Sequence, residues 1–158
     1  MRKIQLTPAE VAFCLAIATQ RDASKPNRDS RHSTNQSGFG VHFSGVIGEV
    51  AFRKVYGGRI DQTIMPTGDK HKPDIVIPDG RKIEVKTSTF TGTDVTLKFE
   101  KNELDFEWCS LVQILGWPDI VNVFPIWSKD RLEFTKEDYG HGERLVFRPL
   151  STLTASSR

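Results

Sequence analysis

The segment "KPDIVIPDGRKIEVKTS", residues 72–88, decides the expected fold because it predicts a β-hairpin with a defined register. Its Pro-Asp-Gly turn suits a three-residue loop, with proline at the second turn position and glycine in the left-handed conformation. Counting back from such a loop sets Asp74 opposite Glu84. Lys86 follows Glu84 by two residues and so lies on the same face of the strand. The turn therefore predicts that two acids and a lysine meet on one side of a sheet.

This gathering of charge needs a physical reason. Two carboxylates about 4 Å apart repel by roughly 4 kcal/mol at an effective dielectric constant near 20. A lysine offsets part of this repulsion, and a divalent cation would offset all of it, since acidic oxygens are the ligands that Mg²⁺ prefers. A metal beside a lysine suits phosphodiester hydrolysis, in which the metal activates water and the lysine orients it. The alternative is an exposed cross-strand salt bridge, because an acid-x-Lys triplet arises about once by chance in a chain of this composition.

The hairpin resembles the PD-(D/E)xK nuclease superfamily through two pieces of sequence, Pro73-Asp74 and Glu84-Val85-Lys86. An additional acid on the preceding helix is usual in that family, and Glu49 in "GVIGEVAF" occupies the corresponding place. The resemblance covers roughly residues 43–127. It implies an α/β fold of the restriction-endonuclease-like type, in which a mixed central β-sheet is flanked by helices around an αβββαβ core.

The resemblance also implies a role for each residue. Asp74 and Glu84 would ligate Mg²⁺ or Mn²⁺, and the backbone carbonyl of Val85 would complete the ligand set. Lys86 would position the attacking water or help to deprotonate it. Glu49 would bind a metal directly or through water, or bind a second ion. The implied activity is that of a metal-dependent deoxyribonuclease, an endonuclease of phage, mobile-element, resolvase or restriction type, which as a small domain often works as a homodimer.

Outside the hairpin, capping and periodicity predict two helices. The capping box at residues 7–10, with proline at the first helical position, opens a helix that should run to about Thr19. The second helix is expected over residues 43–58, with Ser44 as its N-cap and two glycines as its stop. Glycines at positions 45 and 48 leave one side of this helix bare, which suits close packing on a sheet.

The remaining elements are expected mainly as strands. Apolar and β-branched runs predict strands at 94–99, 110–117, 120–127 and 144–147, and a short helix is expected at 100–108. The length allows one domain with a real core. The expected organisation is a single nuclease domain, 1–158, with an N-terminal helix and basic polar loop (1–42), a catalytic core (43–127) and a C-terminal extension (128–158).

Charge and polar side chains point to candidate contacts with DNA. Residues 1–60 carry nine Lys/Arg and four Asp/Glu, a balance of +5, so the rest of the chain carries −3. The candidates lie in the basic loop 20–40, before the hairpin, and along its second strand: Arg28, Arg31, Lys72, Lys82, Thr87 and Ser88. Each has a plainer alternative, because a basic loop is also what a solvated linker looks like and hydroxyls at a strand end are usually just hydrated.

Other features limit the remaining possibilities. The chain has no run of about 18 apolar residues and no signal-peptide pattern, so we expect a cytoplasmic protein that does not span a membrane. Cys14 and Cys109 stand alone and are expected to be ordinary reduced thiols. The four histidines lack the spacing of a zinc site. Two rival hypotheses remain: a nucleic-acid-binding module that does not cleave, and a partner-binding domain whose charges form a surface ion-pair cluster.

Overall fold

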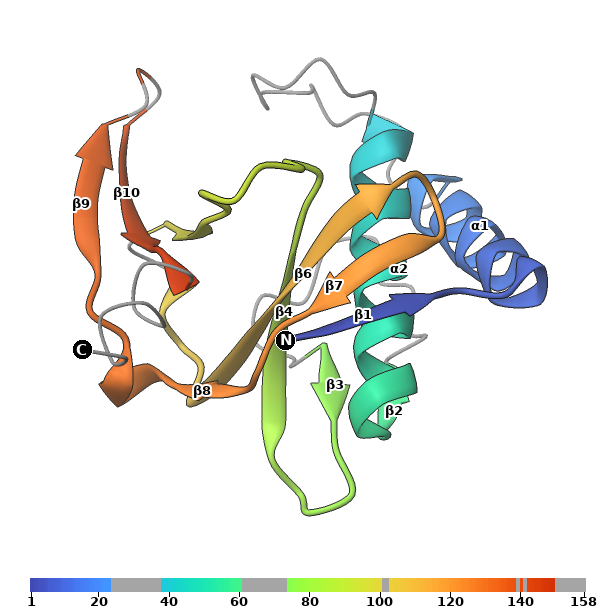
Figure 1. The fold of residues 1–158 in the computed structure, drawn as a ribbon, viewed down its shortest axis with the longest axis horizontal. Coiled ribbons are helices and arrows are strands. Elements are labelled where there is room, and N and C mark those ends of the chain that lie inside the picture. The colour runs from blue at the N-terminus through green and yellow to red at the C-terminus, as the bar shows by residue number, and fades with distance from the viewer. Residues whose placement is uncertain (24–37, 61–73, 101–102, 139, 141, 150–158) are drawn as a thin grey trace.

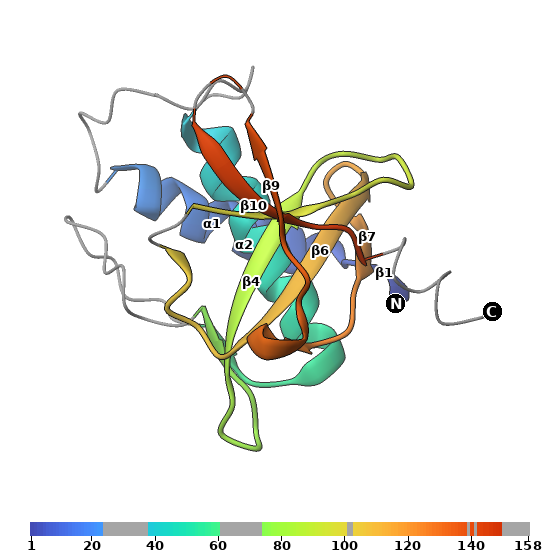
Figure 2. The ribbon, with the colours of Figure 1, turned by 90° about the vertical axis from the view of Figure 1, so that its left-hand side faces the viewer.

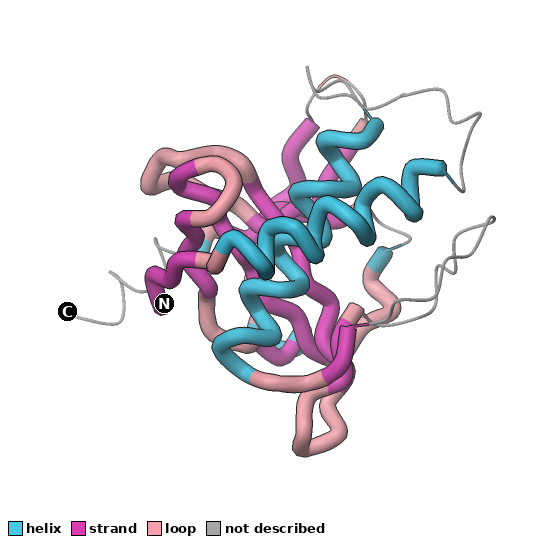
Figure 3. The backbone as a smooth tube through the Cα atoms, turned by 90° about the vertical axis from the view of Figure 1, so that its right-hand side faces the viewer, coloured by secondary structure: helices cyan, strands magenta, loops and turns pink. Residues whose placement is uncertain are grey.

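The computed structural model describes residues 1–23, 38–60, 74–100, 103–138, 140 and 142–149, which form a mixed α/β fold in stacked layers (Figure 1). From left to right in Figure 1, a small antiparallel sheet is followed by a larger mixed sheet and then by two helices. Helix α2 (Gly38–Tyr56) lies on the large sheet, and α1 (Pro8–Ala23) packs against α2. Figure 2 shows the small sheet in front of β4 with the helices behind, and Figure 3 shows both helices from their own side.

The large sheet has the strand order β1-β7-β6-β4-β3-β2, and β8 also pairs with β6. Strands β4 and β6 are parallel, and the other pairs are antiparallel. The strands of this sheet are β1 (Arg2–Gln5), β2 (Arg59–Ile60), β3 (Ile75–Val76), β4 (Lys82–Ser88), β6 (Trp108–Gly116), β7 (Ile120–Val123) and β8 (Trp127–Ser128). The small sheet has the order β5-β10-β9, from β5 (Leu97–Phe99), β9 (Thr135–Asp138) and β10 (Glu143–Phe147). A 3-10 helix, Lys129–Arg131, links β8 to β9.

The hairpin has the register that its turn chemistry predicts. Ile75 lies opposite Ile83, and the Ile77 N–H donates to the carbonyl of Arg81 at 3.0 Å. Gly80 has φ of 91°, the left-handed conformation that the three-residue loop requires. Position 74 is therefore the next one opposite position 84, as the sequence indicated.

The helices begin and end for reasons that the sequence only partly reveals. The capping box is confirmed, because the Thr7 N–H donates to Glu10 Oε2 at 2.7 Å and the Glu10 N–H donates to Thr7 Oγ1 at 3.2 Å. Helix α1 continues past Thr19 to Ala23, so the first four residues of the expected loop are helical. Helix α2 begins at Gly38, and Ser44 is therefore not its N-cap; the Ser44 hydroxyl donates to a carbonyl of the same helix. Two glycines with positive φ follow its last residue, as expected.

Two further expectations need correction. The segment 100–108 is not a helix in its described part, because only residue 103 has 3-10 geometry and β6 begins at Trp108. The strand expected at 94–99 exists as β5, but it belongs to the small sheet. In the described residues the helices cover one face of the large sheet and the small sheet covers the other, whereas the sequence predicted only that helices flank a mixed sheet (Figure 2).

The core consists of two clusters, one on each face of the large sheet. Val112 and Ile114 of β6 join the cluster beneath the helices, whereas Cys109 and Leu111 join the cluster beneath the small sheet. Strand β6 is thus buried on both faces, which explains its nearly continuous apolar sequence. In the described part of the chain neither helix combines the length and apolar character needed to cross a lipid bilayer.

Candidate functional site

The candidate site lies beside the first residue of β3, where β4 continues past β3 with β6 as its remaining neighbour. Alternate residues of β4 turn their backbone polar groups toward β3. At Val85 the N–H donates to Asp74 Oδ2 at 2.8 Å, so a carboxylate takes the place of a strand carbonyl. The carbonyl of Val85 points to the same edge, because the N–H and C=O of one strand residue lie on the same side. This geometry places Asp74 and the Val85 carbonyl together at the open edge of β4.

Glu84 and Lys86 project from the face of β4 that the helices do not cover. Ile83 and Val85 pack in the cluster beneath the helices, so the alternating side chains point the other way. There Lys86 Nζ lies 3.1 Å from Glu84 Oε1 and 5.3 Å from the centre of the Phe99 ring. The predicted pairing of an acid and a lysine on one strand face is therefore present.

A third carboxylate, which the sequence reasoning did not single out, approaches the lysine from outside the hairpin. Glu103 Oε2 lies 3.6 Å from Lys86 Nζ, and it also accepts a hydrogen bond from the Glu100 N–H at 3.0 Å. Burial alone would lower the pKa of Lys86, but the charges of Glu84, Glu103 and Asp74 outweigh burial and raise it. The lysine is therefore a cation at neutral pH.

Asp74 has the most strongly perturbed carboxyl of the site. Its burial, followed by the charges of Glu84 and Glu49, raises its pKa to about 8. The Val85 N–H and the Lys86 ammonium act in the opposite direction but are too weak to compensate. In the absence of an added cation, the Asp74 carboxyl therefore keeps a proton at neutral pH, because protonation removes its repulsion from the other carboxylates. A perturbation of this size in a group of convergent charges is typical of functional sites.

Glu49 reaches the neighbourhood of Asp74 from the helix side of the sheet. It is buried, with 6% of its surface exposed, and its carboxylate is paired in a bidentate manner with Arg21 of α1, at 2.7 and 3.0 Å. Its charge contributes to the raised pKa of Asp74. Three of the four predicted residues, Asp74, Glu84 and Lys86, therefore lie together at β4. Glu49 lies on the helix side of the sheet, where it is paired with Arg21, and acts on Asp74 through its charge.

Close packing of α2 on β4 sets the position of Glu49. A Cβ atom added at Gly48 would lie 1.9 Å from the Thr87 hydroxyl oxygen, so only glycine allows this approach. Nothing lies within 4 Å of a Cβ added at Gly45, so only one of the two expected glycines makes the contact. The Thr87 hydroxyl is buried against the helix with no hydrogen-bond partner. In this conformation it does not reach solvent, where a phosphate would have to be.

The donor set fits a hard cation only in part. Asp74 and the Val85 carbonyl lie at the β4 edge, and Glu84 on the adjoining face is near enough for its charge to act on Asp74. Mg²⁺ is usually bound by one or two carboxylates plus water and substrate phosphates. Among the described ranges there is no group of three or more Asp, Glu, His or Cys side chains placed to hold a metal. Both cysteines are buried and free, and burial raises the pKa of each thiol to about 12, which keeps them protonated at neutral pH.

A pocket of about 360 Å³ adjoins the lysine on the open face of β4. It lies between the end of β4, the loop that follows it, and the edge of the small sheet. Its walls combine basic, hydroxyl and apolar side chains, including Lys86, Ser88, Phe90, Lys98, Leu111 and Arg148. The two cations from the small sheet, at positions 98 and 148, were not among the sequence candidates.

The predicted DNA contacts have different places in the structure. Ser88 lines the pocket, and Lys82 is exposed near the hairpin turn on the same strand face as Glu84. Pro73 and the three remaining basic candidates, Arg28, Arg31 and Lys72, lie outside the described residues.

No family model, curated protein or solved structure matches this chain. A function can therefore be proposed only from the residues of the chain and their geometry.

Proposed function

We propose that the chain is a nuclease that hydrolyses DNA phosphodiester bonds with Mg²⁺ or Mn²⁺, on a core related to the restriction-endonuclease-like fold. The observation that carries this proposal is the Asp74 carboxylate at the Val85 N–H, within electrostatic reach of the Glu84–Lys86 ion pair. The order α2, β2, β3, β4 and then β6, parallel to β4, supports this relation, although the second helix of the αβββαβ pattern is not among the described elements. In the described residues, the crossover from β4 to β6 carries β5 where that pattern has a second helix.

In this proposal the residues at β4 have two roles, to hold the cation and to orient the attacking water. Asp74, Glu84 and the Val85 carbonyl would hold the cation, which when bound polarises a water and neutralises charge on the phosphate. Lys86, held as an ammonium by its carboxylate neighbours, would donate hydrogen bonds to the attacking water or to a phosphate oxygen. Because the pKa of Lys86 is raised, we assign it to orienting the nucleophile in preference to deprotonating it.

Glu49 takes a supporting part in this proposal. Both of its carboxylate oxygens accept from Arg21, so it would reach a cation through an intervening water. Its negative charge also adds to the repulsion at Asp74, which makes binding of a cation there more favourable.

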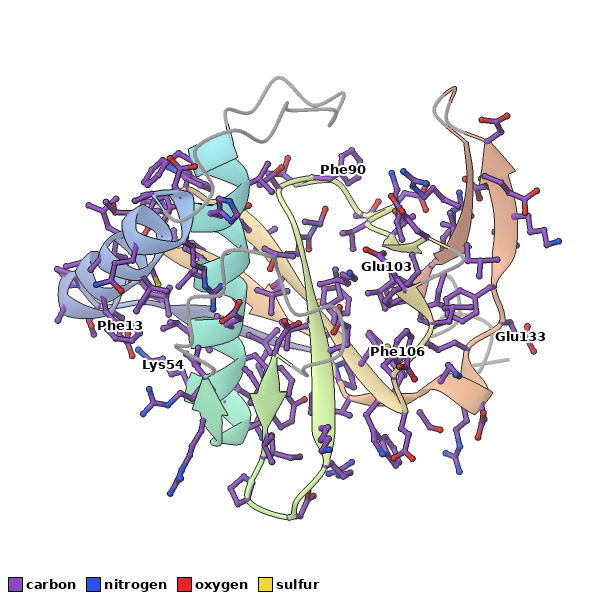
Figure 4. The ribbon with its side chains drawn as sticks, turned by 180° about the vertical axis from the view of Figure 1, so that it is seen from behind. Phe13, Lys54, Phe90, Glu103, Phe106 and Glu133 are labelled. Carbon is purple, nitrogen blue, oxygen red and sulfur yellow. The ribbon has the colours of Figure 1, made fainter. Side chains whose placement is uncertain are left out.

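A supercoiled plasmid incubated with Mg²⁺, with Mn²⁺ or with EDTA tests the proposal. We expect nicking or linearisation that requires the metal and that falls by at least about a hundredfold in Glu84→Gln and in Lys86→Ala, as for loss of a principal electrostatic group. Glu133→Gln is the matched control, since Glu133 is exposed, does not line the pocket and lies well away from Phe90 (Figure 4). Metal-independent cleavage, or full activity in Glu84→Gln, would refute the proposal.

A second candidate is a nucleic-acid-binding module that does not cleave. The ion pairs favour it, because Arg21 neutralises Glu49 while Lys86 neutralises Glu84, a balance that a purely structural cluster would also show. The same plasmid experiment separates the candidates when it is joined to a gel-shift assay. DNA that is bound but stays intact with both metals would favour the module.

A further inference from the structure

An exposed aromatic ring stands at the pocket beside the candidate site. Phe90 lies in the loop between β4 and β5, and 53% of its surface is exposed although it lines the pocket (Figure 4). A Cβ atom added at Gly92 would lie 2.6 Å from the ring, so the ring rests against the loop where that glycine leaves room. A large apolar ring held in water, outside the two core clusters, suggests a ligand contact.

The loop that carries Phe90 is fixed from within the sheet. Gln113 Nε2 donates to the carbonyls of Phe90 and Gly92, at 2.9 and 2.8 Å. The Gln113 oxygen in turn accepts from Asn122 Nδ2 at 3.1 Å, and both amides are buried. Burying amide groups is unfavourable unless they are hydrogen-bonded, and here the bonds are used to anchor the loop. The ring is thus held ready for a ligand, which lowers the entropy lost on binding.

Three basic side chains and one acid, Asp94, line the pocket together with Phe90. Lys98 and Arg148 come from the small sheet and its continuation, and Lys86 comes from the candidate site. Arg148 has two carboxylate partners: its Nε lies 3.4 Å from Asp94, whose side chain is 72% exposed, and its Nη1 pairs with Glu137. An exposed ion pair contributes little to stability, so a phosphate can replace Asp94 while Glu137 keeps the guanidinium in place.

We propose that this pocket binds one unstacked nucleotide of a single-stranded DNA segment, with its base on Phe90 and its phosphates toward Arg148 and Lys98. This assignment rests on the proposed nuclease function and names its substrate class. Bases in a duplex are stacked on each other and cannot offer a face to a side chain, whereas an aromatic ring in a basic groove is a common way to bind single strands. A volume of about 360 Å³ is near the lower end for ligand pockets, which suits one nucleotide and excludes a double helix.

Fluorescence anisotropy tests the assignment without cleavage. A labelled thymidine oligonucleotide of about ten nucleotides, near the site sizes of single-strand binders, and a duplex of equal length are titrated with protein in EDTA. We expect tighter binding of the single strand, a loss of about tenfold or more in Phe90→Ala, and retention in Phe90→Trp. Trp117→Ala is the control, because Trp117 is equally exposed, packs on Phe43 and does not line the pocket.

The possible outcomes separate this inference from the nuclease proposal when cleavage with Mg²⁺ is measured in parallel. Phe90-dependent binding of the single strand without any cleavage supports the pocket and overturns the nuclease function. Metal-dependent cleavage with unchanged single-strand binding in Phe90→Ala, or a wild-type preference for duplex, overturns the pocket alone. Absence of binding to either oligonucleotide overturns the pocket, and absence of cleavage in addition overturns both. Thermal melting of each variant checks that it is folded.

Discussion

Replacing Asp74 by asparagine should stabilise the protein in the absence of divalent cations, and the gain should depend on pH. The raised pKa of about 8, against an ordinary value of 3.8, means that the folded state retains a proton that the unfolded state has lost. The unfolded state then binds fewer protons, so the free energy of unfolding falls as the pH rises from about 4 to 8 and levels off above. Asparagine removes the titrating group and keeps an oxygen to accept from the Val85 N–H.

The structure sets the scale of this effect. A separation of about four pH units corresponds to at most roughly 6 kcal/mol at about 1.4 kcal/mol per unit. Asp74 is half-buried and gains water as it ionises, so we expect a stabilisation of about 2 kcal/mol at pH 9 and close to none at pH 4.

Urea denaturation at pH 4, 7 and 9 in EDTA measures the difference, with Asp130→Asn as an exposed control. Adding Mg²⁺ at pH 8 should then stabilise the wild type but not Asp74→Asn. The reason is that the proposed cation site needs the negative charge of the Asp74 carboxylate, which asparagine lacks. An Asp74→Asn variant whose advantage is the same at pH 4 and pH 9 would contradict the reasoning from a buried charge.

Three further changes test other parts of the structure. Gly48→Ala should destabilise the protein by about 1–3 kcal/mol, because the new Cβ overlaps the Thr87 hydroxyl. Gly45→Ala should be neutral or stabilising by up to ~1 kcal/mol. Equal effects of the two substitutions in urea denaturation would refute the close contact of α2 with β4. Arg148→Gln should reduce the salt dependence of single-strand binding by about 0.7 in the slope of log K against log salt concentration, and an unchanged slope would exclude a phosphate contact. Gln113→Leu should cost about 1–3 kcal/mol and make the 89–94 loop more sensitive to limited proteolysis, and a loop that resists protease as in the wild type would show that the amide is not its anchor.

The parts of the fold that follow from neighbouring residues could be predicted from the sequence. The hairpin register depends on a turn of three residues and on the two-residue period of a strand, so the pairing of Ile75 with Ile83 could be predicted correctly. The capping box and the stop of α2 are equally local. Strand β6 was visible because burial on both faces leaves a continuous apolar run.

The parts that depend on distant partners could not be predicted. Helical spacing is overridden at residues 104–108 because Phe106 stacks on Phe99, with ring centres 4.7 Å apart, and because Trp108 pairs with β8. The pairing of Arg21 with Glu49 joins residues 28 positions apart, and no spacing rule announces it. Glu103 likewise reaches the site only because the chain returns past Lys86 after β5.

The small sheet also has a consequence for the order in which the protein can become complete during synthesis. Strand β5 pairs with β10, so Leu97 and Phe99 find their backbone partners some fifty residues later in the chain. Arg148, at the far end of that pairing, is one wall of the pocket. A chain emerging from the ribosome would therefore contain its hairpin acids long before the residues that enclose them, and β10, the last described strand, would complete the pocket.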